Sequence, residues 1–76
     1  MVTELDAQVR GRVIVAEGLA EIIRLTARLS QEDLAEIVGC TGAAISRYEG
    51  GSRRPSGPVG RRYLQALAHL AAGERP

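Results

Sequence analysis

The chain has 76 residues, a formal net charge of +1 and one cysteine, Cys40. This length suits a single domain, so we expect no additional catalytic or ligand-sensing domain, and one cysteine excludes an intrachain disulfide. No apolar run approaches the ~20 residues needed to span a bilayer, and no signal peptide is visible at the start, so we expect a cytoplasmic protein with no membrane partner.

Apolar residues recur at helical spacing along the first third of the chain. The steps between them are three or four positions, which predicts one face of a long helix, formed by Leu5, Val9, Val13, Ala16, Ala20, Ile23 and Ala27. Thr3 is a suitable cap for this helix. Gly11 and Gly18 interrupt the pattern, and each costs up to about 1 kcal/mol relative to alanine, so we expect a break or kink at either one.

The middle of the chain predicts two short helices joined by a tight turn. Ser30 is a good N-cap for the first helix, with Asp33 three residues later, and Gly39 ends it as a left-handed cap. Thr41 then caps the second helix, over residues 42–49. Because only about three residues separate the two helices, they must pack at a steep angle, and together they form a helix-turn-helix unit.

A loop and one further helix complete the chain. The segment "GGSRRPSGP" is rich in turn-forming residues, and Ser56 would cap a last helix that begins near Gly57 and ends at Gly73. The apolar stripe of this helix is expected to be Val59, Tyr63, Leu64, Leu67, Leu70 and Ala71. Because the chain has no Phe and no Trp, we expect an aliphatic core built from Leu, Ile, Val and Ala.

These elements predict an all-α fold. We expect a compact helical bundle of four to five helices that contains a helix-turn-helix and carries an N-terminal helical extension. The boundaries we assign are an extension over residues 1–15, a helix-turn-helix domain over 16–72 and a tail over 73–76.

The charges are unevenly distributed along the chain. Residues 1–36 carry four arginines and seven acids, a net charge of −3, whereas residues 37–76 carry six arginines and two acids, a net charge of +4. A basic half is compatible with phosphate binding. The chain has no paired-acid, metal or phosphate-loop constellation at usable spacing, so we expect no enzymatic activity, no metal and no cofactor.

The segment "RLSQEDLAEIVGCTGAAISRYEGGSRRPS" strongly resembles the Xre-type, Cro-like helix-turn-helix family of phage and bacterial repressors. The match covers residues from about 16 to 70, and several separated positions agree in register. The resemblance implies binding to double-stranded DNA, with phosphate contacts from Gln31, Thr41, Gly42, Arg53 and Arg54. It also implies base-edge contacts from Ala43, Ser46 and Arg47, and a structural ion pair between Arg24 and Glu49.

The leading functional interpretation is a sequence-specific DNA-binding transcriptional regulator. It would be a homodimeric repressor that reads the major groove with helix 42–49. One such domain contacts few base pairs, and two-fold pairing suits a palindromic operator. Residues 1–15 would help to form the dimer, because Ile14 and Leu25 lie opposite the main apolar stripe and supply spare apolar surface.

The sequence alone leaves two other functions open. The segment "RRPSGPVGRRYLQAL" is similar to part of the DNA-binding domains of certain antitoxins, so the alternative is an antitoxin that neutralises a toxin partner and autorepresses its operon. The first turn of helix 42–49, Gly-Ala-Ala, brings little chemistry and would also fit a protein-interaction module that has lost DNA binding.

Several single residues have two interpretations. Cys40 is small core filler or a redox or metal-binding residue, and Tyr48 packs in the fold or stacks on a base. Arg61 and Arg62 form a solvated face or contact phosphates, whereas His69 reads as a solvated surface residue.

Overall fold

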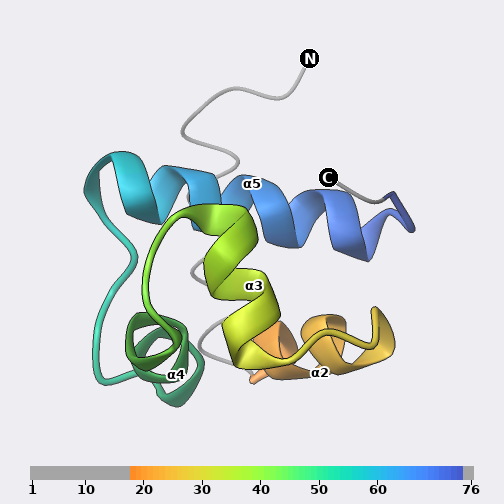
Figure 1. The fold of residues 1–76 in the computed structure, drawn as a ribbon, viewed down its shortest axis with the longest axis horizontal. Helices are drawn as coiled ribbons and strands as arrows, with labels where there is room; N and C mark the ends of the chain where they lie inside the picture. Colours follow the sequence, from red (N-terminus) through yellow and green to blue (C-terminus); the bar gives the residue numbers. More distant parts are fainter. Residues whose placement is uncertain (1–17, 75–76) are drawn as a thin grey trace.

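The computed structural model describes residues 18–74, and this part of the chain contains four helices (Figure 1). They are α2 (Leu19–Thr26), α3 (Gln31–Val38), α4 (Gly42–Gly50) and α5 (Gly57–Ala71). No strand occurs between residues 18 and 74, and the prediction of a compact all-α fold is confirmed. The predicted extension over residues 1–15, with its cap at Thr3, lies outside the described residues.

The longest helix, α5, holds the other three together. It contacts both α2 and α3, while α3 packs on α4 at a steep angle (Figure 1). The predicted helix-turn-helix is therefore α3 and α4, supported by α2 and α5. None of these four helices combines the length and the hydropathy needed to cross a membrane.

The helix boundaries follow from the predicted capping residues. Ser30 and Asp33 form a reciprocal capping box at α3, with both hydrogen bonds at 2.9 Å, and these bonds lower the pKa of Asp33. Gly39 ends α3 with a left-handed φ of 84°, a conformation that strains residues with a Cβ. Thr41 accepts a hydrogen bond from the Ala44 backbone N–H at 3.1 Å and so caps α4.

Ser56 has the predicted position at the start of α5, but the predicted capping hydrogen bond of its side chain is wrong. Ser56 occupies the N-cap position of α5, but its side chain accepts no capping hydrogen bond. An N-cap side chain accepts from the N–H of the second or third helical residue. The second residue of α5 is Pro58, which has no N–H, so the sequence itself removes one of the two donors.

The core is less aliphatic than the composition suggested. Tyr63 is the largest fully buried side chain, and its ring lies 4.6 Å from that of Tyr48, centroid to centroid, with a tilt of 36°. Tyr48 is therefore a packing residue in this fold. Burial raises the pKa of the Tyr63 phenol, whose oxygen has no hydrogen-bond partner among residues 18–74. The aliphatic part of the core includes Ala20, Leu34, Val38, Ile45 and Leu67.

The buried stripe of α5 differs from the predicted one at three positions. Ala71 is exposed, whereas Gly60 and Ala66 are buried. At 100° per residue, Ala71 lies roughly 80° from Tyr63, at the centre of the buried face, and it belongs to the final turn of the helix. Gly60 is buried because the backbone of Pro55 lies against it, a contact that helical periodicity does not indicate.

The close approach of the Pro55 backbone to Gly60 leaves no space for a larger residue at position 60. A Cβ added at this position would lie 2.6 Å from the Pro55 carbonyl carbon, so Gly60→Ala should lower the free energy of unfolding by about 1–3 kcal/mol through overpacking. Gly50→Ala is the matched control, because an added Cβ there meets nothing within 4 Å. Urea denaturation of both variants checks this; equal stability would show that the loop and α5 separate at no cost.

Candidate nucleic-acid interface

The turn between α3 and α4 is held by main-chain and side-chain hydrogen bonds. The N–H groups of Gly39 and Cys40 both donate to the Ala35 carbonyl, at 2.8 and 2.9 Å. Arg62 of α5 donates from Nε to the Val38 carbonyl at 2.8 Å. Arg62 thus satisfies one of the free carbonyls at the end of α3 and ties the turn to α5, a role that neither interpretation of the sequence included.

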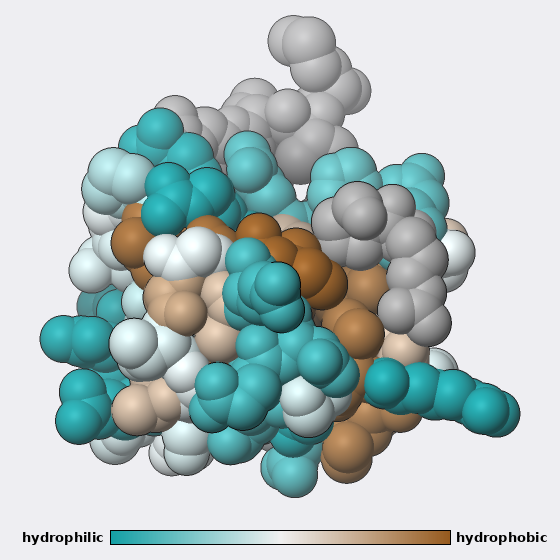
Figure 2. Space-filling view, in the orientation of Figure 1, coloured by the Kyte–Doolittle hydropathy of each residue, from teal (hydrophilic) through white to brown (hydrophobic). Residues whose placement is uncertain are grey.

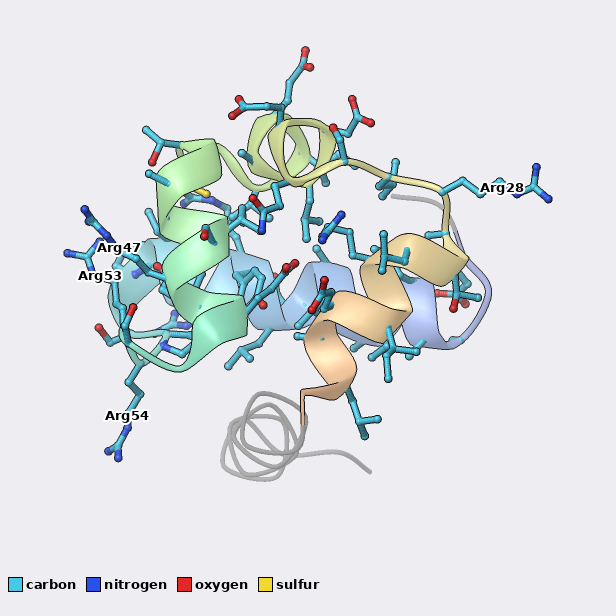
Figure 3. All side chains as sticks on the ribbon, turned by 90° about the horizontal axis from the view of Figure 1, so that it is seen from below. Arg28, Arg47, Arg53 and Arg54 are labelled. Atoms are coloured by element: carbon cyan, nitrogen blue, oxygen red, sulfur yellow. The ribbon has the colours of Figure 1, made fainter. Side chains whose placement is uncertain are left out.

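One side of α4 is exposed and the other is buried. Ala44, Ile45 and Tyr48 face the core, whereas Ala43, Ser46 and Arg47 are exposed. The three residues that the resemblance assigns to base contacts therefore share the free face of α4. Figure 3 shows that Arg47 extends from the same side of the molecule as Arg53 and Arg54 in the following loop.

This side of the molecule is positively charged. Residues 40–62 hold five arginines and a single acid, Glu49. Glu49 is neutralised by Arg24, and no ion pair engages Arg47, Arg53 or Arg54 within residues 18–74. Three exposed guanidinium groups without acidic partners suit an anionic partner such as a phosphate backbone.

A buried network fixes α4 relative to α2. Arg24 donates from Nε and Nη2 to the two carboxylate oxygens of Glu49, at 2.6 and 3.1 Å, and from Nη1 to the Leu29 carbonyl at 2.9 Å. The hydrogen bond with Glu49 raises the pKa of Arg24. Gln31 adds a 3.2 Å hydrogen bond from its amide Nε2 to Glu49 Oε1. One N–H of Gln31 is thereby committed inward, and only the other remains for a phosphate.

The carboxylate of Glu32 lies close to Gly42, the first residue of α4. Gly42 is buried, and an added Cβ would overlap the carboxylate of Glu32. A carboxylate is favourable at the positive end of a helix dipole, which is also where a DNA phosphate would bind. Glu32 therefore places a negative charge close to the first residue of α4, a feature that the sequence pattern did not reveal.

The Glu32 carboxylate should weaken binding to any duplex. Glu32→Gln removes its charge and is expected to strengthen binding to specific and random duplexes alike by roughly 1 kcal/mol, about fivefold. Glu36→Gln, also on α3, is the matched control. Fluorescence anisotropy at constant salt measures both; equal affinities for the two variants would mean that no phosphate approaches Glu32.

The remaining singled-out residues lie away from this face or pack in the fold. Cys40 is half-buried against the core, and burial raises the pKa of its thiol, which fits the packing interpretation. Residues 18–74 contain no group of three or more His, Cys, Asp or Glu side chains that could hold a metal ion. His69 is exposed, and its Nδ1 lies 2.7 Å from Oε2 of Glu74.

Comparison with protein families identifies the family of this chain. A family model described as a helix-turn-helix domain matches residues 18–75, which cover all four described helices. No curated protein and no solved structure matches the chain.

Proposed function

Because this chain belongs to the helix-turn-helix domain family, we propose that it is a transcriptional regulator that binds double-stranded DNA in a sequence-specific manner. Two copies act together on DNA as a homodimeric repressor of the Xre type, with α4 of each copy in the major groove. The two-fold symmetry of such a dimer selects a palindromic operator with half-sites one helical turn apart, about 34 Å.

The observation that carries this proposal is the composition of one face. Ala43, Ser46 and Arg47 lie on the exposed side of α4, and Arg53 and Arg54 extend to the same side from the next loop (Figure 3). Side chains at the centre of such a face contact base edges, and flanking arginines contact phosphates. Gln31, Thr41 and the Gly42 backbone supply the remaining phosphate contacts in this proposal.

Selection of bound duplexes from a random pool tests the proposal with the full chain. We expect an enriched sequence with two inverted half-sites, because each copy contributes one α4. An enriched sequence without inverted symmetry would contradict the homodimer. Failure to enrich any sequence at low salt would contradict DNA recognition and would favour a protein-interaction module.

The role of Arg53 as a phosphate ligand predicts a change in salt dependence. Arg53→Ala should weaken binding to all sequences similarly and reduce the slope of log K against log salt by about 0.9, the value for one phosphate contact. Arg28→Ala serves as the control when both variants are measured on a duplex with one half-site, where no contact between copies contributes, because Arg28 extends from the opposite side of the molecule in Figure 3. A slope equal to that of wild type would remove Arg53 from the interface.

The antitoxin alternative has a weaker basis. It rests on the "PSGP" segment, but the backbone of Pro55 in this segment packs closely on Gly60. The segment therefore has a packing role within the fold, and no described feature requires a toxin. Co-purification of an endogenous toxin with the full chain would favour the antitoxin role.

A further inference from the structure

The outward face of α2 is apolar. Ile22 and Leu25 are each 56% exposed, and Leu19 is 37% exposed, whereas Ala20 and Arg24 on the other face are buried. At 100° per residue, Ile22 and Leu25 lie on the side opposite the core, where a surface helix ordinarily carries polar residues. Figure 2 shows this apolar surface in brown over α2, at the lower right of the view.

This face is separate from the candidate DNA interface. In Figure 3, Arg47, Arg53 and Arg54 extend to one side of the molecule, while α2 lies beyond α4 on the way to Arg28 on the opposite side. A protein bound to the outward face of α2 would leave the exposed side of α4 free. The apolar face is therefore available to a partner while the protein is on DNA.

The charges beside the apolar residues suit a second copy of the same face. Glu21 lies near the start of α2 and Arg28 follows its end; both are exposed, and neither forms an ion pair within residues 18–74. When two α2 helices pack antiparallel about a two-fold axis, Ile22 of one copy meets the partner's Leu25. The same rotation brings Glu21 near the partner's Arg28.

We propose that the outward face of α2 forms a two-fold contact between two copies of this chain bound side by side on DNA. One rotation matches apolar with apolar residues and acid with base, which is the self-complementarity that an isologous interface requires. The part of the chain that the structure describes measures 31 × 26 × 22 Å. The distance between equivalent points on two adjacent copies is therefore comparable with ~34 Å, one turn of DNA.

The proposed α2 contact rests on the proposed DNA-binding function, because the contact is too small to hold two copies together without DNA. A single eight-residue helix with two or three apolar residues buries less than a stable dimer interface needs, about 1,200 Å² or more. Two copies at low concentration stay apart, and adjacent half-sites bring them together. The α2 contact then appears as cooperative binding to DNA.

The test compares duplexes carrying one and two selected half-sites. With the full chain, Ile22→Ser combined with Leu25→Ser should reduce affinity for the two-site duplex roughly tenfold or more and leave one-site affinity within about twofold. Ile37→Ser is the matched control, because Ile37 is an apolar residue of α3 that is 42% exposed. Equal loss in the control, or cooperativity equal to wild type in the double variant, would overturn the proposal.

Exchange of the two charges identifies the partner as a second copy. Glu21→Arg and Arg28→Glu should each reduce cooperativity, and a chain carrying both should recover it, because each copy then presents the exchanged pair. Failure of the combined variant to recover would overturn the contact. If the apolar residues were covered by residues 1–17 of the same chain, the serine variants would lower the melting temperature without DNA and leave cooperativity unchanged.

The outcome for the contact is separable from the outcome for DNA binding. Wild-type chain that binds the one-site duplex but shows no cooperativity on two sites would overturn the α2 contact and leave DNA recognition intact. Wild-type chain that binds neither duplex would overturn both.

Discussion

Replacing Glu49 with leucine is expected to lower the free energy of unfolding by about 3–5 kcal/mol, because it leaves the guanidinium of Arg24 buried without its counter-ion. The two side chains are only 7% and 5% exposed, and two hydrogen bonds join them. For a chain of this length the total stability is about 4–11 kcal/mol, at 0.05–0.15 kcal/mol per residue. Denaturant titration of Glu49→Leu measures the loss.

A double-mutant cycle with Arg24→Met distinguishes the ion pair from the two side chains taken separately. The variant carrying both substitutions has no unpaired charge and should be more stable than Glu49→Leu alone. It also remains informative if the single variant fails to fold. Losses that simply add, with no coupling between the two positions, would show that the pair makes no specific contribution.

The parts of the fold that were predictable from the sequence are those with local causes. A capping box needs only Ser30 and Asp33 at the correct spacing, and the left-handed end of α3 needs only a glycine at position 39. The start of α2 has a local cause of the same kind, since Gly18 adopts a left-handed φ of 73° immediately before the helix begins. These signals locate the helix-turn-helix because its two helices and its turn are contiguous in sequence.

The errors arise where one element packs against another. The periodicity of the apolar residues in α5 does not indicate that the backbone of Pro55, in the preceding loop, lies against Gly60. The bond from Arg62 to Val38 spans 24 residues and joins a side chain of α5 to the end of α3. Helical periodicity gives the phase of one helix but contains no information on what its neighbours place against it.

In the candidate interface, too, some features could be predicted from the sequence and others could not. The exposed face of α4 could be predicted because Ile45 sets the inward direction and the other positions follow at 100° per residue. The position of Glu32 over Gly42 could not, because a first-turn acid is also accounted for by the dipole of its own helix. Likewise, the bond from Gln31 to Glu49 links the ends of two different helices.

In the proposed DNA complex, the sparse first turn of α4 leaves base reading mainly to one long side chain. Relative to Ile45, Ala43 lies at roughly 160°, Arg47 at 200° and Ser46 at 100° around the helix. Ala43 can offer only a methyl group to a thymine methyl, and Ser46 has a short hydroxyl. The Arg47 carbonyl accepts from the Ser52 N–H at 3.0 Å and from the Arg53 N–H at 3.3 Å, so the loop anchors the backbone from which Arg47 extends.

Arg47→Ala is therefore expected to cost about 1–3 kcal/mol per half-site and to flatten the preference at one base pair, most simply a guanine that Arg47 contacts through two hydrogen bonds. Arg47→Lys is the matched control: it keeps the positive charge but loses the bidentate geometry. Lysine should thus preserve most of the affinity for random duplexes while losing the base preference almost as fully as alanine. Repeating the duplex selection with both variants measures the preference directly. If both variants select the wild-type sequence, the preference arises elsewhere, from DNA shape or from half-site spacing, and Arg47 contacts only the phosphate backbone.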